Sequence, residues 1–119
     1  MNWYLAKIIF RIICGDGDHK PQFDEQLRLI AAADSEMAFD KATAIGQQEA
    51  QSFLNQQGKL VEWKFIDIAE LYKITELIDG AELFSRVQET ECPDIYIQLV
   101  HERAAFIRHN NTHKHLQLL

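Results

Sequence analysis

The chain has 119 residues, a formal charge of −6 at pH 7, a hydrophobic fraction of 47% and a charged fraction of 25%. This length and balance are typical of a globular domain that buries a core without disulfides or a structural metal. The acidic balance argues against nucleic-acid partners, because binding to a polyanion draws on a broad basic surface.

The first expected element is a strand over residues 3 to 14, where β-branched and aromatic residues are dense on both parities. Lys7 and Arg11 interrupt this apolar run, which is also far shorter than the roughly 20 residues that span a bilayer as a helix. No basic segment precedes the run, as a signal peptide would require. We therefore expect a cytoplasmic protein without a membrane partner.

A turn and a second strand follow. Residues 14 to 22 contain two glycines, two aspartates and a proline, which favour a chain reversal. From Phe23 to Ala31, apolar residues such as Leu27 and Leu29 alternate with polar ones. This alternation is typical of a strand with one dry face.

The longest helical pattern comes next. Asp34 or Ser35 can cap a helix that extends to about Gln57, because apolar residues recur there at helical spacing. Gly58 stands where a left-handed residue commonly closes a helix.

The second half of the chain predicts two strands and a helix. Alternation over residues 61 to 65 indicates a third strand, and the pattern extends towards Tyr72. After a turn at Asp79-Gly80, alternation over residues 81 to 89 predicts a fourth strand. Pro93 suits the first position of a final helix over residues 93 to 108, with a strand at residues 95 to 100 as the alternative.

The predicted order is β-β-α-β-β-α, and it favours an α+β fold. Two hairpins backed by helices most simply form a four-stranded, mostly antiparallel sheet with both helices on one face. No linker is longer than a turn, so we predict a single domain over residues 1 to 109 and a C-terminal tail over residues 110 to 119.

Four segments together resemble a small bacterial family known as domain of unknown function 4288: MNWYLAKIIF, QFDEQLRLI, WKFIDIAELYKI and DGAELFSR. The resemblance covers most of residues 2 to 108. It implies a compact α+β domain without an assigned role, and it carries over no site residue.

Two motifs of metal proteins are present only in part. The loop Asp16-Gly17-Asp18-His19 offers oxygen ligands at alternate positions, but Lys20 takes the next position, which favours an ordinary polar turn. His101-Glu102 begins the H-E-x-x-H pattern of zinc proteases, but Ala105 stands in place of the second histidine.

The densest histidine cluster lies at the end of the chain: His109, His113 and His115. These side chains could hold a divalent metal, but Asn110-Asn111 is a helix stop, and basic residues are common near a helix C-terminus. Acidic stretches near residues 34 to 40 and 89 to 94 lie at helix starts, where the helix dipole favours them. We predict no metal site, no cofactor and no catalytic residue.

The sequence favours a binding or protein-interaction module over an enzyme. A small enzyme or ligand-binding protein, with a site assembled from scattered residues, is the alternative, although no nucleophile signature or phosphate loop supports it. An accessory protein that neutralises a basic partner is a third hypothesis.

A self-association interface is predicted on the first strand, which is apolar on both parities. Only two helices are available to cover the sheet, so one face needs a partner, which a second copy could supply. The side chains expected in this interface are Trp3, Leu5, Ile9 and Ile13.

A patch of cations is predicted on the sheet face opposite the helices. Strand parity places one or two there from each strand: Lys7, Arg11, Arg28, Lys64 and Arg86. Such a patch could bind an anion or an acidic partner segment. Acidic residues of the same parity could instead form cross-strand ion pairs with these cations.

Overall fold

The computed structural model of the chain describes residues 1–110. The chain divides into two compact units, Met1–Ser85 and Arg86–Leu119, and each is described by itself. The expectation of a single domain over residues 1 to 109 therefore stays a prediction. Of the predicted tail over residues 110 to 119, all but Asn110 lies outside the described residues.

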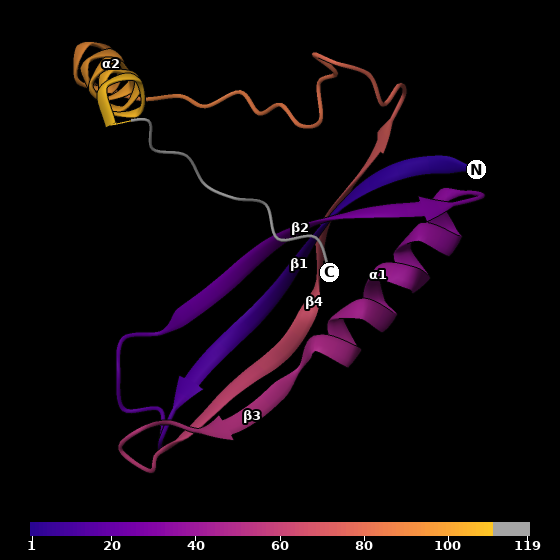
Figure 1. Cartoon of the computed structure of the whole chain (residues 1–119), viewed down its shortest axis with the longest axis vertical. Helices are drawn as coiled ribbons and strands as arrows, with labels where there is room; N and C mark the ends of the chain where they lie inside the picture. The colour runs from indigo at the N-terminus through magenta and orange to yellow at the C-terminus, as the bar shows by residue number, and fades with distance from the viewer. Residues whose placement is uncertain (111–119) are drawn as a thin grey trace. The chain divides into compact units, whose positions relative to one another are not determined.

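The first unit contains all of the strands found among residues 1–110 (Figure 1). Its elements are β1 (Asn2–Cys14), β2 (Gln22–Ala32), α1 (Ser35–Glu49), β3 (Gln51–Leu54) and β4 (Leu60–Ile74). The second unit contains α2 (Pro93–Asn110). The predicted α+β fold and the order β-β-α-β-β-α are confirmed.

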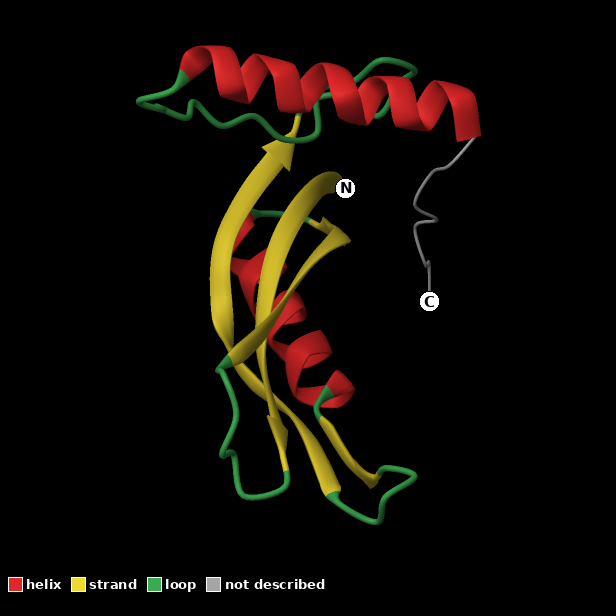
Figure 2. Cartoon of the chain, turned by 90° about the vertical axis from the view of Figure 1, so that its left-hand side faces the viewer, coloured by secondary structure: helices red, strands yellow, loops and turns green. Residues whose placement is uncertain are grey.

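The four strands form one antiparallel sheet in the order β2-β1-β4-β3. Helix α1 lies behind the sheet and covers one of its faces (Figure 2). The longest strand pairings of the unit are β1 with β2, which follow each other through the turn of residues 15–21, and β1 with β4. Both edges of the sheet, β2 and β3, have one side without a neighbouring strand in this unit.

The core lies between α1 and the alternate residues of β1 that face it. Ile8 and Phe10 of β1 and Ile30 of β2 are fully buried there. Helix α1 contributes small residues to the contact, with Ala38, Ala42 and Gly46 buried. Small side chains let the helix axis approach the sheet closely, so the large strand residues fill the space between them.

Asp34 begins α1 as an N-cap. Its backbone is extended, with φ −148°, and its Oδ1 accepts a hydrogen bond of 2.8 Å from the Met37 N–H. We expect Asp34→Ala to lower the free energy of unfolding by about 1 kcal/mol, since one helical N–H loses its partner. Chemical denaturation measures this loss, and Asp34→Asn, which keeps an acceptor, should recover most of it. Equal losses in both variants would contradict the capping role.

The predicted helix is shorter than expected at its C-terminal end. It ends at Glu49, and residues 51–54 pair with β4 as the short strand β3 instead. Phe53 stacks on Trp63 of β4, with ring centroids 6.3 Å apart. Gly58 does not cap the helix, since it has φ +76° in the β3–β4 turn, where Asn55 Oδ1 accepts two backbone N–H groups. The helical spacing of apolar residues thus extends in the sequence beyond the end of α1, into the β3–β4 hairpin.

The predicted strand over residues 81 to 89 is wrong. Residues 81–90 have no regular secondary structure. The sheet still has four strands, because the short β3 is present before the long β4. Phe84 packs edge-on against Tyr72 of β4, with centroids 5.4 Å apart. Alternation alone cannot form a strand, because its backbone also needs an adjacent strand to pair with.

In the second unit, residues 93–110 form the helix α2, so the alternative strand at residues 95 to 100 is absent. Arg108 and His109 lie in its last turn, where positive charge is favourable. Among residues 1–110, no helix is both long enough and apolar enough to cross a membrane.

Candidate functional site

The sheet of the first unit has one face that α1 does not cover. On β1, the buried residues from Tyr4 to Phe10 that face α1 alternate with residues that point the other way. The cross-strand register carries this division to the neighbouring strands, because directly opposed residues share a face. We call the uncovered side the open face; it presents Trp3, Leu5, Lys7, Ile9, Arg11, Ile13, Phe23, Glu25, Leu27, Leu29, Glu62, Lys64, Asp67, Glu70 and Tyr72.

Lys7 lies on the open face, where it forms ion pairs with two glutamates. Its Nζ is 3.0 Å from Glu25 Oε1 and 3.6 Å from Glu70 Oε2. The hydrogen bond to Glu25 raises the pKa of Lys7, partial burial opposes the rise, and the charges of the two carboxylates add to it. Lys7 therefore acts as a cross-strand tie between β2, β1 and β4.

Arg11 and Lys64 lie directly opposite each other on the open face. Both side chains are exposed, and the Arg11 guanidinium lies 5.8 Å from the ring centre of Phe23. Within residues 1–110, neither cation has an acid within ion-pair distance. Like charges on opposed positions of neighbouring strands repel each other, so the fold itself does not benefit from this pair.

Arg28 does not lie on the open face. It is opposed to Ala6, which is buried against α1, and its Nη2 is 3.9 Å from Glu49 Oε2 of that helix. The prediction took the apolar side of β2 to face the helices. The register reverses this assignment, because only Ile30 and Ala32 of β2 reach the core.

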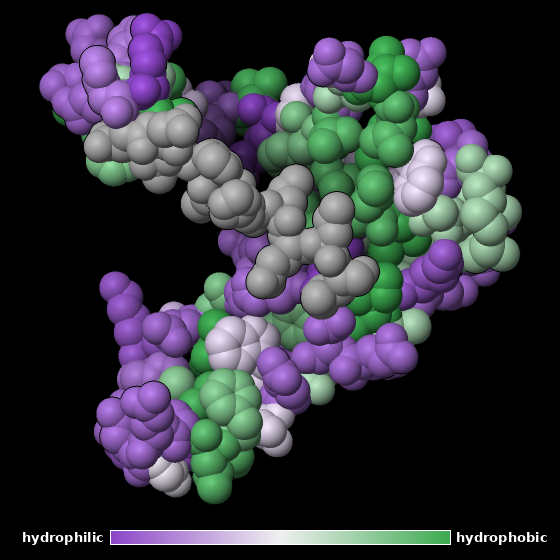
Figure 3. All heavy atoms as spheres, in the orientation of Figure 1, coloured by the Kyte–Doolittle hydropathy of each residue, from purple (hydrophilic) through white to green (hydrophobic). Residues whose placement is uncertain are grey.

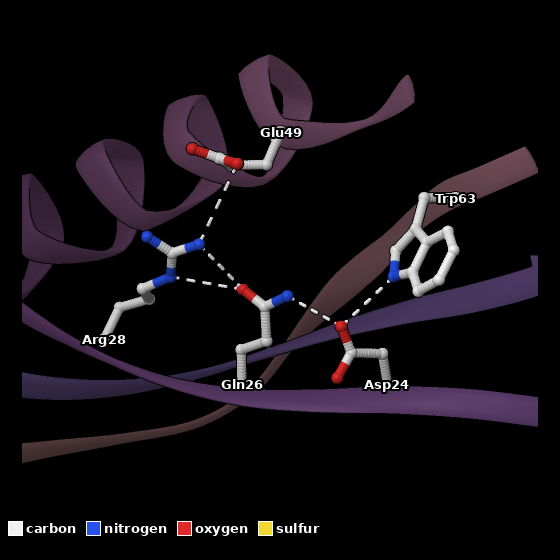
Figure 4. A network of polar contacts seen from close by, with 5 residues as sticks. All are labelled: Asp24, Gln26, Arg28, Glu49 and Trp63. Carbon is white, nitrogen blue, oxygen red and sulfur yellow. Dashed lines mark hydrogen bonds and ion pairs between the residues drawn. The ribbon is translucent and has the colours of Figure 1, made fainter. Parts of the chain in front are cut away.

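Arg28 instead belongs to a polar network on the α1 side of β2 (Figure 4). Its Nε and Nη2 donate to Gln26 Oε1 at 3.1 and 2.9 Å, and Gln26 Nε2 donates to Asp24 Oδ2 at 2.7 Å. Trp63 Nε1 of β4 donates to the same carboxylate oxygen at 3.1 Å. These bonds satisfy polar groups on a face that the end of α1 leaves partly uncovered.

Arg86 does not extend the cation patch. It is the first residue of the second unit and lies in a segment without regular secondary structure, so the strand that was to carry it is absent. Of the five predicted cations, the sheet therefore brings three together on the open face: Lys7, Arg11 and Lys64.

The four predicted interface residues all lie on the open face, but they differ in exposure. Trp3 is 38% exposed, whereas Leu5 is 7% exposed. Leu5 is opposed to Tyr72, and Phe84 packs against the Tyr72 ring. Residues of the first unit therefore already cover the open face near Leu5. Ile9 and Ile13 are half-buried.

The most exposed apolar row of the open face was not predicted as an interface. Phe23, Leu27 and Leu29 of β2 are 54%, 51% and 42% exposed. The alternation of β2 was visible in the sequence, but it does not say which side of a strand meets the helix. In the space-filling view, hydrophobic residues likewise reach the surface between hydrophilic ones (Figure 3).

The turn between β1 and β2 borders a depression of about 610 Å³ that Lys59 also lines. His19 has both ring nitrogens engaged there, since Nε2 accepts from the Cys14 N–H at 3.0 Å and Nδ1 donates to the Lys20 carbonyl at 2.9 Å. Asp16 Oδ1 accepts from the Asp18 N–H at 3.0 Å, as in an ordinary polar turn. The His19 and Asp16 side chains of this depression are therefore engaged in holding the turn.

Metal binding has no support among residues 1–110, where no three His, Cys, Asp or Glu side chains gather as ligands. His109 is in the last turn of α2, whereas His113 and His115 lie outside the described residues.

Comparison with known proteins places the chain in a family. A family model described as domain of unknown function (DUF4288) matches residues 3–85, which is nearly the whole first unit. No curated protein and no solved structure matches the chain. Because the matched segment is well over half of the 119 residues, the chain belongs to the family of domain of unknown function DUF4288.

Proposed function

We propose that this chain is a protein-interaction module that binds an acidic, partly apolar segment of a partner on the open face of its sheet. The observation that carries the proposal is the exposed row of Phe23, Leu27 and Leu29, which lies beside half-buried Ile9 on the neighbouring strand. Exposed apolar side chains gathered on one strand face are costly in water, and they are a usual mark of a contact surface, although Glu25 separates Phe23 from Leu27 here.

Charge selects the kind of partner. Arg11 and Lys64 lie at opposed positions, with no acid of residues 1–110 within ion-pair distance, and carboxylates of a partner would relieve their repulsion. Lys7 is already neutralised by Glu25 and Glu70, so it adds little attraction. The partner segment therefore needs acidic residues at one end and apolar residues towards β2.

The shape of the open face favours a peptide over a small molecule. A small-ligand site needs a concave pocket lined by convergent polar groups. The depression at the β1–β2 turn has its histidine tied to the backbone, so it supports the alternative of an enzyme or small-ligand site poorly. A cytoplasmic setting and the lack of nucleic-acid binding remain predictions of the sequence.

Peptide binding tests the proposal. A fluorescent twelve-residue peptide of alternating Glu and Leu should bind the full chain, and its lysine–leucine counterpart should not. We expect the double variant Arg11→Ala/Lys64→Ala to weaken binding about tenfold, since each exposed ion pair contributes up to about 1 kcal/mol. Fluorescence anisotropy at two salt concentrations measures both effects.

Lys73→Ala is the matched control, because Lys73 is an exposed cation of β4 that is opposed to Tyr4 on the α1 side. This variant should bind as well as the parent. If the glutamate peptide does not bind at millimolar concentration, or binds the double variant unchanged, the proposal fails.

A further inference from the structure

Strand β2 is a long edge without a bulge, and its charged residues are Asp24, Glu25 and Arg28. It has eleven residues without a proline or a lysine, and its register with β1 runs from Ala32 to Gln22 without a bulge. Natural sheets commonly shorten, charge or bend such edges, because an open edge is a template for another strand. The opposite edge, β3, has only four residues.

We propose that two copies of this chain pair through β2, antiparallel, about a two-fold axis that passes beside Gln26. In this register Asp24 lies opposite Arg28 of the second copy, and the symmetry repeats this pair. Phe23 likewise lies opposite Leu29 of the second copy on the open face. Both kinds of contact are favourable between opposed residues of neighbouring strands.

The polar network of each copy leaves groups for this contact. Asp24 uses Oδ2 for both of its hydrogen bonds, and Arg28 uses Nε and Nη2 (Figure 4). Within residues 1–110, no partner is assigned to Asp24 Oδ1 or to Arg28 Nη1. Opposed Cβ atoms lie about 4.5–5.5 Å apart, which is within reach of an ion pair between these side chains.

Neighbouring registers are less favourable. An axis beside Glu25 would set two Glu25 carboxylates against each other. An axis beside Leu27 would set Asp24 against Ile30 and extend the pairing to Ala31, whose carbonyl already accepts a 2.6 Å hydrogen bond from Lys41 Nζ. The register at Gln26 uses residues 22–30 and stops before that carbonyl.

The pairing would join two four-stranded sheets into one of eight strands, with the two open faces continuous across the axis. It goes beyond the proposed function, because it concerns the backbone edge of β2 and a different partner, although Phe23 and Leu29 of the open face contribute to both contacts. A chain that remains monomeric but binds the acidic peptide would overturn the pairing alone, whereas a dimer that binds no peptide would overturn only the proposed function.

Sedimentation of the full chain over a dilution series tests the pairing. The parent should dimerise, and Asp24→Arg or Arg28→Asp should each weaken the dimer at least tenfold by opposing like charges. An equimolar mixture of these two variants should restore a dimer, because both opposed pairs are then of opposite sign. Asp40→Arg, on the exposed side of α1, is the control and should leave the dimer unchanged.

Cross-linking tests the register even if the charge variants fold poorly. Gln26→Cys, with Cys92→Ser, should form a disulfide-linked dimer on mild oxidation, because Gln26 opposes itself across the axis. Arg28→Cys in the same background should not. Monomers at every concentration, single charge variants that dimerise as the parent does, or equal cross-linking at both positions would overturn the proposal.

Discussion

Replacing Phe10 with alanine is expected to lower the free energy of unfolding by about 3–5 kcal/mol. Phe10 is 1% exposed at the centre of the sheet and packs edge-on against Phe65, with centroids 6.1 Å apart. The backbone around it is fixed by β2 on one side and β4 on the other, so the cavity cannot collapse. Urea denaturation followed by circular dichroism measures the loss.

Phe39→Ala is the matched control, because it deletes the same side chain from a 42% exposed position on α1. Its loss should stay at about 0.5 kcal/mol, the usual size of a surface substitution. Losses of similar size in the two variants would show that Phe10 is not central to the core.

The second large effect is expected at Gly46, where α1 approaches the sheet most closely. A Cβ at this position would overlap the ring of Phe65. Alanine gains about 1 kcal/mol over glycine in a helix interior, but overpacking costs about 1–3 kcal/mol. We therefore expect Gly46→Ala to destabilise the protein, although helix propensity alone predicts the opposite sign.

A double-mutant cycle with Phe65→Ala isolates the cause. In the Phe65→Ala background the overlap is gone, so Gly46→Ala should be neutral or stabilising. Ala44→Leu, at an exposed position of the same helix, controls for helix propensity and should change stability little. A destabilisation by Gly46→Ala that persists without the Phe65 ring would contradict the argument.

These two positions lie on the α1 side of the sheet, apart from the proposed docking surface. Variants of Arg11 and Lys64 should therefore alter peptide binding without a large loss of stability, since both side chains are exposed. Removing their mutual repulsion could even stabilise the fold slightly. Stability measurements on the binding variants thus separate a lost contact from a lost fold.

The sequence by itself determined the fold class and the places of β1, β2, most of α1, β4 and α2, because hydrophobic periodicity reports directly on local backbone geometry. The alternation of Ile8 and Phe10 with Lys7 and Arg11 correctly divides β1 into two faces. The cap at Asp34 and the turn after Cys14 were likewise readable, since a single side chain and its neighbours carry those signals. The family match agrees with the resemblance of the four quoted segments.

Only the tertiary structure decided which side of each strand meets α1 and which segments pair. The alternation in β2 shows that the strand has two different faces, but it does not show which face meets α1. The register opposes Arg28 to buried Ala6, so the apolar side chains of β2 lie on the open face instead. Residues 51–54 pair with β4 as a strand although their sequence does not alternate, whereas residues 81–89 alternate but have no regular secondary structure. Strand pairing is a contact between distant segments, so its free energy depends on the partner that the fold brings close.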